Sequence, residues 1–199
     1  MNPLTSALRQ AAEDLNRAGR RWALVGGFAV STRVEPRFTR DIDLAVMVDN
    51  DDDAEALVRS LIVDGYTVFS SVEHDSGRLA TVRMTRTFSG IDVVVDLLFA
   101  SSGIEAEVAR AAEVLEIMTG LTLPVATIGH LIALKVLARD DTTRPQDVAD
   151  LRALIAAAGP ADLAVAQESV ILIEERGFNR GRDLRAGLAE LVASSGSTW

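Results

Sequence analysis

The sequence predicts an α+β fold in two parts, a core lobe of strands and helices over residues 1–100 and a mainly helical lobe over residues 101–199. Short apolar runs bounded by turn residues, which predict buried strands, are concentrated in the first half. Apolar residues at helical spacing, preceded by capping residues and followed by glycines, dominate the second half. With 199 residues and 48% hydrophobic content, the chain can bury a substantial core.

Each predicted element follows from a local pattern. Leu4, Leu8 and Leu15 recur at helical spacing, and Gly19 follows them as a stop signal. The core lobe is expected to contain helices over residues 3–18, 28–34 and 51–64 and strands over residues 21–25, 41–48, 66–71, 79–85 and 91–99. The second lobe is expected to contain a hairpin over residues 114–126 and helices over residues 103–112, 127–139, 143–158, 161–176 and 180–194.

The composition limits the class of protein. The chain has no cysteine, so nothing indicates disulfides, thiolate metal sites or a cysteine nucleophile. No apolar run approaches the roughly 18 residues of a membrane span, so a cytoplasmic protein without a membrane partner is expected. The net charge of −9 argues against general coating of nucleic acid.

Basic residues are nevertheless concentrated in one window near the N-terminus. They are Arg17, Arg20, Arg21, Arg33, Arg37 and Arg40. A local positive patch can bind a polyanion even in an acidic protein, because phosphate contact depends on the local field. The alternative is that these arginines are solvated charges on helix surfaces.

Two aspartates open the predicted strand over residues 41–48. Residues i and i+2 of a strand point to the same face, so Asp41 and Asp43 are expected to lie side by side. Like charges this close repel, which raises one pKa unless a cation offsets the repulsion. Mg²⁺ is a natural candidate, because one or two carboxylates and substrate phosphates are its usual ligands. The alternative is an exposed strand end.

Two further motifs suit a phosphate-binding site. Gly26 and Gly27 end one predicted strand and open a helix, which presents bare backbone N–H groups. Asp92 and Asp96 lie on one face of a later strand, and either could be a third carboxylate. The glycines could also serve the turn alone.

The second lobe contributes its own charged group. Lys135, the only lysine of the chain, lies on one predicted helix, and Asp147 and Asp150 lie on one face of the next. A lysine is a compact point charge that suits a phosphate oxygen. The alternative is that the two aspartates pair with nearby arginines.

Together these motifs resemble those of the DNA polymerase β-like nucleotidyltransferase superfamily. Its signature is a Gly-Gly or Gly-Ser pair followed, after a short spacer, by Asp-x-Asp, as in Gly26-Gly27 and Asp41-Ile42-Asp43. The segments "GGFAV", "RFTRDIDL", "VDLL" and "LIALKVLARDDTTRPQDVADL" are similar to the AbiEii group, which includes the MenT-type toxins of bacterial toxin–antitoxin pairs. The resemblance implies a nucleotidyltransferase fold in the first lobe, with a mixed sheet flanked by helices.

The resemblance also implies an activity and its partners. The chain would move an NMP from an NTP to an acceptor, here the 3′ end of tRNA, and so act as a growth-inhibiting toxin. Mg²⁺ or Mn²⁺ ions, bound by Asp41, Asp43 and Asp96, would clamp the entering and leaving oxygens. The implied NTP is CTP or another pyrimidine nucleotide, and the implied protein partner is a cognate antitoxin.

Individual roles carry over from the family motifs. Asp96 is the expected general base, with Asp92 as the reserve. Gly26 and Gly27 would cradle the triphosphate, with Gly27 standing where many relatives have Ser. Lys135 would neutralise the triphosphate as pyrophosphate leaves.

Other roles are less closely tied to a motif. Asp147 matches a later aspartate of the family, and Arg33, Arg37 and Arg40 are candidate RNA contacts. Two other functions use the same fold. A small-molecule nucleotidyltransferase, of the antibiotic-modifying kind, would not need the arginines, and a non-catalytic regulatory relative would not depend on metal.

Overall fold

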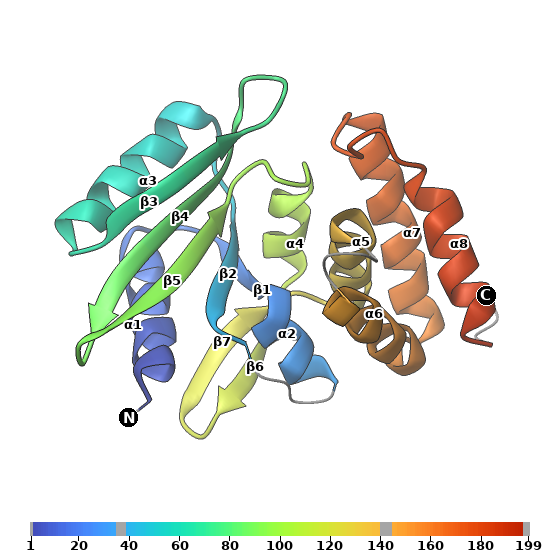
Figure 1. Cartoon of the computed structure of the whole chain (residues 1–199), viewed down its shortest axis with the longest axis horizontal. Coiled ribbons are helices and arrows are strands. Elements are labelled where there is room, and N and C mark those ends of the chain that lie inside the picture. Colours follow the sequence, from blue (N-terminus) through green and yellow to red (C-terminus); the bar gives the residue numbers. More distant parts are fainter. Residues whose placement is uncertain (1, 35–38, 140–144, 197–199) are drawn as a thin grey trace.

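A seven-stranded mixed sheet forms the centre of the computed structural model, which describes residues 2–34, 39–139 and 145–196 (Figure 1). Its strands are β1 (Trp22–Val25), β2 (Asp41–Val46), β3 (Thr67–Glu73), β4 (Leu79–Phe88), β5 (Ile91–Leu98), β6 (Glu113–Met118) and β7 (Leu121–Val125). Their order in the sheet is β3-β4-β5-β2-β1-β7-β6. The predicted α+β fold is confirmed.

The helices lie on both faces of the sheet and in a separate layer beside it (Figure 1). They are α1 (Pro3–Arg17), α2 (Gly26–Arg33), α3 (Asp51–Val63), α4 (Glu105–Ala111), α5 (Ile128–Ala138), α6 (Pro145–Ala157), α7 (Pro160–Glu175) and α8 (Leu184–Ser194). α1 and α3 pack against β4, whereas α2 and α4 contact β1 and β2. α5 packs against α6, α7 and α8 and forms the helical layer with them. No helix within the described ranges is long and apolar enough to cross a membrane.

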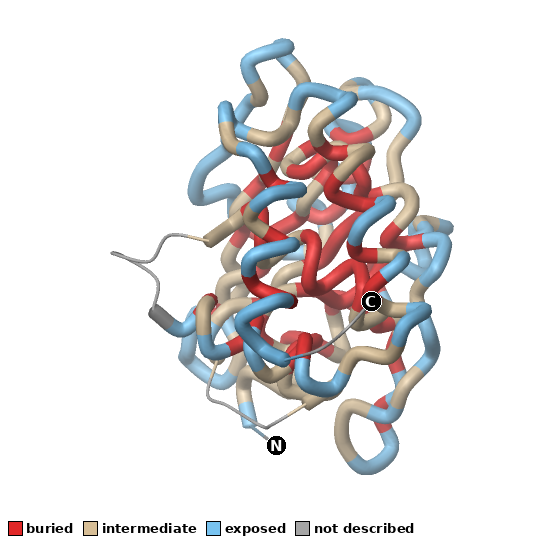
Figure 2. Tube along the Cα trace, turned by 90° about the vertical axis from the view of Figure 1, so that its right-hand side faces the viewer, coloured by how far each residue is buried: buried red, intermediate tan, exposed pale blue. Residues whose placement is uncertain are grey.

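Buried and partly exposed residues alternate along β4, so its two faces differ in burial. Buried residues run through the centre of the molecule, with exposed segments around them (Figure 2). Along β4, Ala80, Val82 and Met84 are buried while the residues between them are partly exposed. This alternation leaves Arg83 on the face that also carries the strand residues of the site.

The hairpin between β4 and β5 fixes the register of that face. Its two-residue turn is Ser89-Gly90, and both residues have positive φ values, 52° and 79°. Such turns match the twist of the strands that they join. From Phe88 paired with Ile91, the pairing continues residue by residue to Arg83 opposite Asp96.

Several boundaries differ from the predicted ones, and two of these differences bear on the sheet and the site. α2 begins at Gly26, two residues earlier than expected, because β1 ends at Val25 and the chain turns at once. The hairpin β6–β7 joins the sheet through a parallel pairing of Leu24 with Val125, so the sheet continues past residue 100 to Val125. The predicted helix start at residue 143 lies outside the described residues.

Candidate active site

Three carboxylates meet near the start of β2. β2 and β5 run parallel, with Asp43 paired with Asp96. Asp41 lies two residues before Asp43 and faces the same side of the sheet. Ile42 and Leu44 are fully buried on the other side. Asp41, Asp43 and Asp96 are therefore neighbours in space.

Arg83 of β4 is the cation that contacts two of these carboxylates. Its Nε and Nη2 donate to the two oxygens of Asp96 at 2.8 and 2.7 Å. Nη2 also lies 3.7 Å from Asp41 Oδ2. The pKa of Arg83 is raised, chiefly by the hydrogen bonds to Asp96. The guanidinium is therefore a permanent charge of the site, and none of the motifs recognised in the sequence includes it.

The pKa of Asp43 is raised by its surroundings. Burial, and then the charges of Asp96 and Asp41, raise the pKa of Asp43 to about 6, although Lys135 and Arg83 act in the opposite direction. An exposed aspartate has a pKa of about 3.9. Because the folded pKa exceeds the unfolded one, the neutral form stabilises the fold, and this contribution is lost as the pH rises through 6.

We expect Asp43→Asn to raise the stability of the metal-free protein. The gain at pH 7.5 should be about 1–2 kcal/mol, after allowance for the partial exposure of the side chain, because the variant carries no charge there. It should shrink as the pH falls from 6 to 4, where the wild-type carboxyl takes up its proton. Thermal melting in EDTA at pH 4.5 and 7.5 measures both values. Asp92→Asn, which removes an exposed carboxylate on the same face of the sheet, is the control. An equal gain in stability for Asp43→Asn at both pH values would contradict the expectation.

Gly26 makes room for Asp43. It has a φ of +64°, and a Cβ atom there would lie 1.9 Å from Asp43 Oδ2 and 2.6 Å from Cγ. No residue with a side chain fits this position unless the carboxylate or the start of α2 moves. The α2 helix that follows has no side-chain cap at Val25, so the N–H groups of its first turn are available to an anion.

Lys135 joins α5 to α6 through two buried aspartates. Its Nζ lies 2.6 Å from Asp147 Oδ1 and 2.8 Å from Asp150 Oδ2. Asp147 and Asp150 are 4% and 3% exposed, so each ion pair with this lysine is a buried one. Asp147 Oδ2 is buried and has no hydrogen-bond partner among the described residues.

These groups line one cavity of about 860 Å³, which we call the first cavity. Gly26 and Gly27 line it on one side, and Lys135 and Asp147 line it on the helical side. Asp41, Asp43, Asp96, Arg83, Arg40 and Arg180 also line it. The glycine pair, the carboxylates and the lysine therefore face one shared space.

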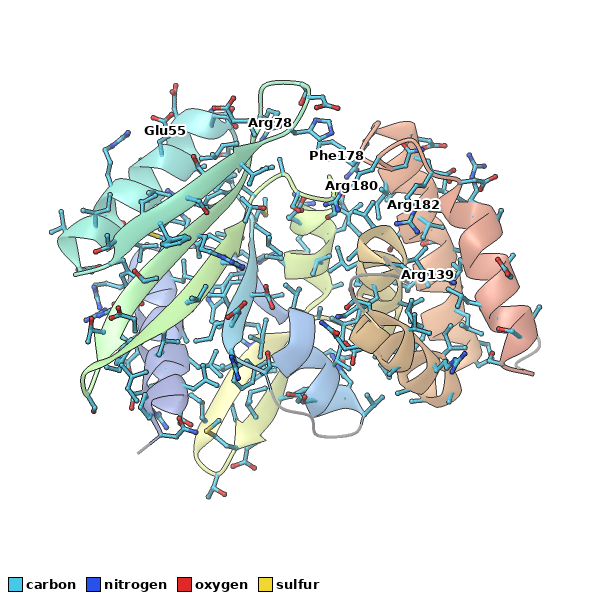
Figure 3. All side chains as sticks on the ribbon, in the orientation of Figure 1. Glu55, Arg78, Arg139, Phe178, Arg180 and Arg182 are labelled. Atoms are coloured by element: carbon cyan, nitrogen blue, oxygen red, sulfur yellow. The ribbon has the colours of Figure 1, made fainter. Side chains whose placement is uncertain are left out.

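A second cavity of about 820 Å³ adjoins the first. Arg83, Asp96, Ser101 and Arg180 line both cavities. The remaining walls come from the ends of β3 and β4, with the loop between them, and from the segment between α7 and α8. Figure 3 shows Phe178 and Arg180 between this end of the sheet and α7, and the Phe178 ring stacks on His74 with 4.0 Å between ring centroids.

The arginine window divides into separate groups. Arg17 bonds to Asp14 and Asp64, and Arg20 bonds to Asp53. Both precede β1, whereas the site lies beyond its other end.

Three arginines of the window were predicted RNA contacts. Arg33 is largely buried, with an ion pair to Glu113 at 2.6 Å and hydrogen bonds to the carbonyls of Val125 and Ala126. Arg40 is exposed and lines the first cavity, and Arg37 lies outside the described residues. The RNA role of these residues stays a prediction.

Asp92 is apart from the other carboxylates. It is exposed near the hairpin turn, where Thr87 donates to it, and it lies four residues from Asp96 along β5. Since a strand rises about 3.3 Å per residue, the two are about 13 Å apart along the strand. Asp96, not Asp92, is the residue that the fold brings to Asp43.

The site fits a hard divalent ion through two carboxylates. Asp41 and Asp43 offer oxygen ligands from one face, and substrate phosphates complete such a shell. In the segments that the structure describes, no group of three or more His, Cys, Asp or Glu side chains is arranged to hold a metal ion. Asp96, expected as a third ligand, accepts hydrogen bonds from Arg83 at both of its oxygens.

Solved structures similar to this one are nucleotidyltransferase-like. An antigenic nucleotidyltransferase-like protein from Paracoccidioides brasiliensis has a TM-score of 0.60 at 18% identity, over 97% of this chain and 88% of that one. ANT(2″)-Ia in complex with adenylyl-2″-tobramycin has a TM-score of 0.57 at 13% identity, over 86% of this chain and 97% of that one. At these identities the likeness shows the fold. No curated protein matches the sequence.

The fold of these structures and the sequence family of the chain together identify a nucleotidyltransferase, an enzyme that transfers an NMP from an NTP. The sequence also matches a family model, "Nucleotidyl transferase AbiEii toxin, Type IV TA system", over residues 11–193. The chain belongs to the AbiEii family of nucleotidyltransferase toxins. Membership in a toxin–antitoxin family implies an antitoxin as a partner, and it favours the enzyme over a non-catalytic relative.

Proposed function

We propose that this chain transfers a nucleoside monophosphate to the 3′ end of tRNA, so that the tRNA can no longer be aminoacylated and growth stops. One observation supports nucleotidyl transfer as the chemistry of this site. Asp43 and Asp96 lie paired across β2 and β5, beside Asp41, in the wall of a cavity that Gly26 and Lys135 also line. The tRNA acceptor rests on the resemblance to MenT-type toxins.

The reaction is an in-line displacement at the α-phosphorus. A hydroxyl oxygen of the acceptor bonds to phosphorus as the bond to the pyrophosphate oxygen breaks, and the hydroxyl proton passes to Asp96. Asp41 and Asp43 would hold Mg²⁺ or Mn²⁺, which supplies positive charge to the triphosphate. The N–H groups that begin α2, from Gly26 and Gly27, receive phosphate oxygens.

Lys135 acts on the leaving group. Two of its three ammonium hydrogens point to Asp147 and Asp150, which leaves the third for a phosphate oxygen. The role of Asp147 is then to hold the ammonium in place. Negative charge that develops on pyrophosphate is stabilised by this fixed cation.

The acceptor enters from the second cavity. Nucleophile and leaving group lie on opposite sides of the phosphorus in an in-line reaction. Asp96 and Arg83 line both cavities, whereas Gly26, Gly27 and Lys135 line only the first. The nucleotide therefore takes the first cavity, and the hydroxyl that Asp96 deprotonates comes from the second.

The experiment is incubation of the folded protein with each labelled NTP and total tRNA. We expect label at the tRNA 3′ end, strongest with CTP or another pyrimidine nucleotide, and a loss of about 10²–10³-fold or more in Asp41→Ala. Arg40→Ala should raise the KM for tRNA, whereas Arg59→Ala, a control on the surface of α3, should not. Failure of every NTP to label RNA would refute the tRNA acceptor.

A small-molecule acceptor has one observation in its favour. Glu73 and Asp75 line the second cavity and would attract a cationic substrate such as an amino sugar. Tobramycin, added as a competing acceptor in the same assay, separates the two functions. Label in tobramycin and none in RNA would replace the tRNA proposal with this one.

A further inference from the structure

Arg83 lies where an ion shared by two of the three carboxylates would lie. Its Nη2 is 2.7 Å from Asp96 Oδ2 and 3.7 Å from Asp41 Oδ2, so one nitrogen stands between side chains from two neighbouring strands. Its Nε holds the other oxygen of Asp96 at 2.8 Å. The side chains of Asp96 and Arg83 are 9% and 41% exposed, so the carboxylate is buried and its cation reaches the cavities.

This contact changes what Asp96 can do. A parallel two-point contact with a guanidinium satisfies one lone pair on each oxygen and fixes the plane of the carboxylate. A divalent ion that bound Asp96 would face a permanent positive charge less than 3 Å from the same oxygens, which disfavours it strongly. The other lone pair of each oxygen remains able to accept a proton.

We propose that Arg83 takes the place of a second metal ion, so that the enzyme works with one divalent ion held by Asp41 and Asp43. This inference rests on the proposed nucleotidyl transfer, but it does not depend on which acceptor is used. It departs from the two-ion site with three carboxylate ligands that the family resemblance implied. Arg83 fixes Asp96 as a base and supplies positive charge next to the reacting phosphate.

Arg83 has further N–H donors with which to contact the reacting phosphate. A guanidinium carries five N–H donors, and two of them go to Asp96. Because Arg83 lines both cavities, it lies at the boundary where the proposed reaction puts the α-phosphate. Planar donors at this position can contact the oxygens of the phosphoryl group as it transfers.

Binding of Mn²⁺ tests the proposal without turnover. The full chain is titrated with Mn²⁺ in the presence of an α,β-methylene NTP and no acceptor, and bound metal is counted by electron paramagnetic resonance. We expect one Mn²⁺ per chain. Asp43→Asn should weaken binding by about tenfold or more, whereas Asp96→Asn should change it less than about twofold. Two ions per wild-type chain, or equal losses in the two variants, would overturn the proposal.

Removal of the arginine provides the converse test. Arg83→Met frees Asp96, so a second Mn²⁺ should bind, while Arg83→Lys, which keeps a cation, should still bind one. A single ion in Arg83→Met would show that the arginine does not exclude the second. If Arg83→Met fails to fold, the comparison of Asp96→Asn with Asp43→Asn still decides. Since no acceptor is present, failure of the tRNA assay leaves these results intact.

Discussion

Gly26→Ala is expected to reduce nucleotidyl transfer strongly while the protein stays folded. The new Cβ would lie 1.9 Å from Asp43 Oδ2, so either the carboxylate or the start of α2 must move by an ångström or more. A displacement of about 1 Å in a catalytic group can reduce the rate about 10²-fold. We expect at least that loss in kcat/KM for the NTP, measured with saturating acceptor.

Gly19→Ala is the matched control for this substitution. Gly19 has nearly the same φ as Gly26, +67° against +64°, but nothing lies within 4 Å of its Cβ position. Both variants carry the cost of about 1–2 kcal/mol for an alanine in the left-handed region. Only Gly26→Ala should lose activity. Equal activity in the two variants would show that the position of Asp43 does not depend on this glycine.

Lys135→Met is expected to lower both stability and activity. The buried carboxylates of Asp147 and Asp150 would lose their ion pairs with Lys135, and breaking a buried pair costs about 3–5 kcal/mol. For a chain of this size the melting temperature should fall by about 10 °C. Lys135→Arg keeps the charge but replaces a compact ammonium with a broad fork, so it should melt near the wild type and remain weakly active.

A triple variant separates the structural role of Lys135 from its catalytic role. Lys135→Met, Asp147→Asn and Asp150→Asn together remove the cation and both buried charges. This variant should recover most of the lost melting temperature but no activity. If it recovers activity as well, then Lys135 does not touch the substrate and serves only to join α5 to α6.

Much of the site could be predicted from local sequence. The alternation of strand residues placed Asp41 and Asp43 on one face, and the structure confirms that neighbours in the strand point to opposite sides. Arg83 could also have been found. Ser89-Gly90 lies between two predicted strands, and a two-residue turn there implies that residues whose numbers add to 179 lie opposite each other, which pairs Arg83 with Asp96 and Asp92 with Thr87.

Other parts depend on contacts between distant segments. The space between Gly26 and Asp43 is set by the antiparallel pairing of β1 with β2, and no local pattern gives its size. Arg33 is held inside the protein by Glu113 and by carbonyls some ninety residues away along the chain. Charge clustering in the sequence therefore could not separate internal arginines from accessible ones.

The length of the Ser89-Gly90 turn limits which insertions and deletions homologues of this enzyme can accept. A one-residue slip of a strand turns every side chain to the opposite face. One inserted residue in this turn would offer Val95 or Leu97 to the cavity in place of Asp96, with the sequence of the site itself untouched. Homologues should therefore vary the residues of this turn, within the few types that tolerate positive φ, while insertions and deletions accumulate in other loops.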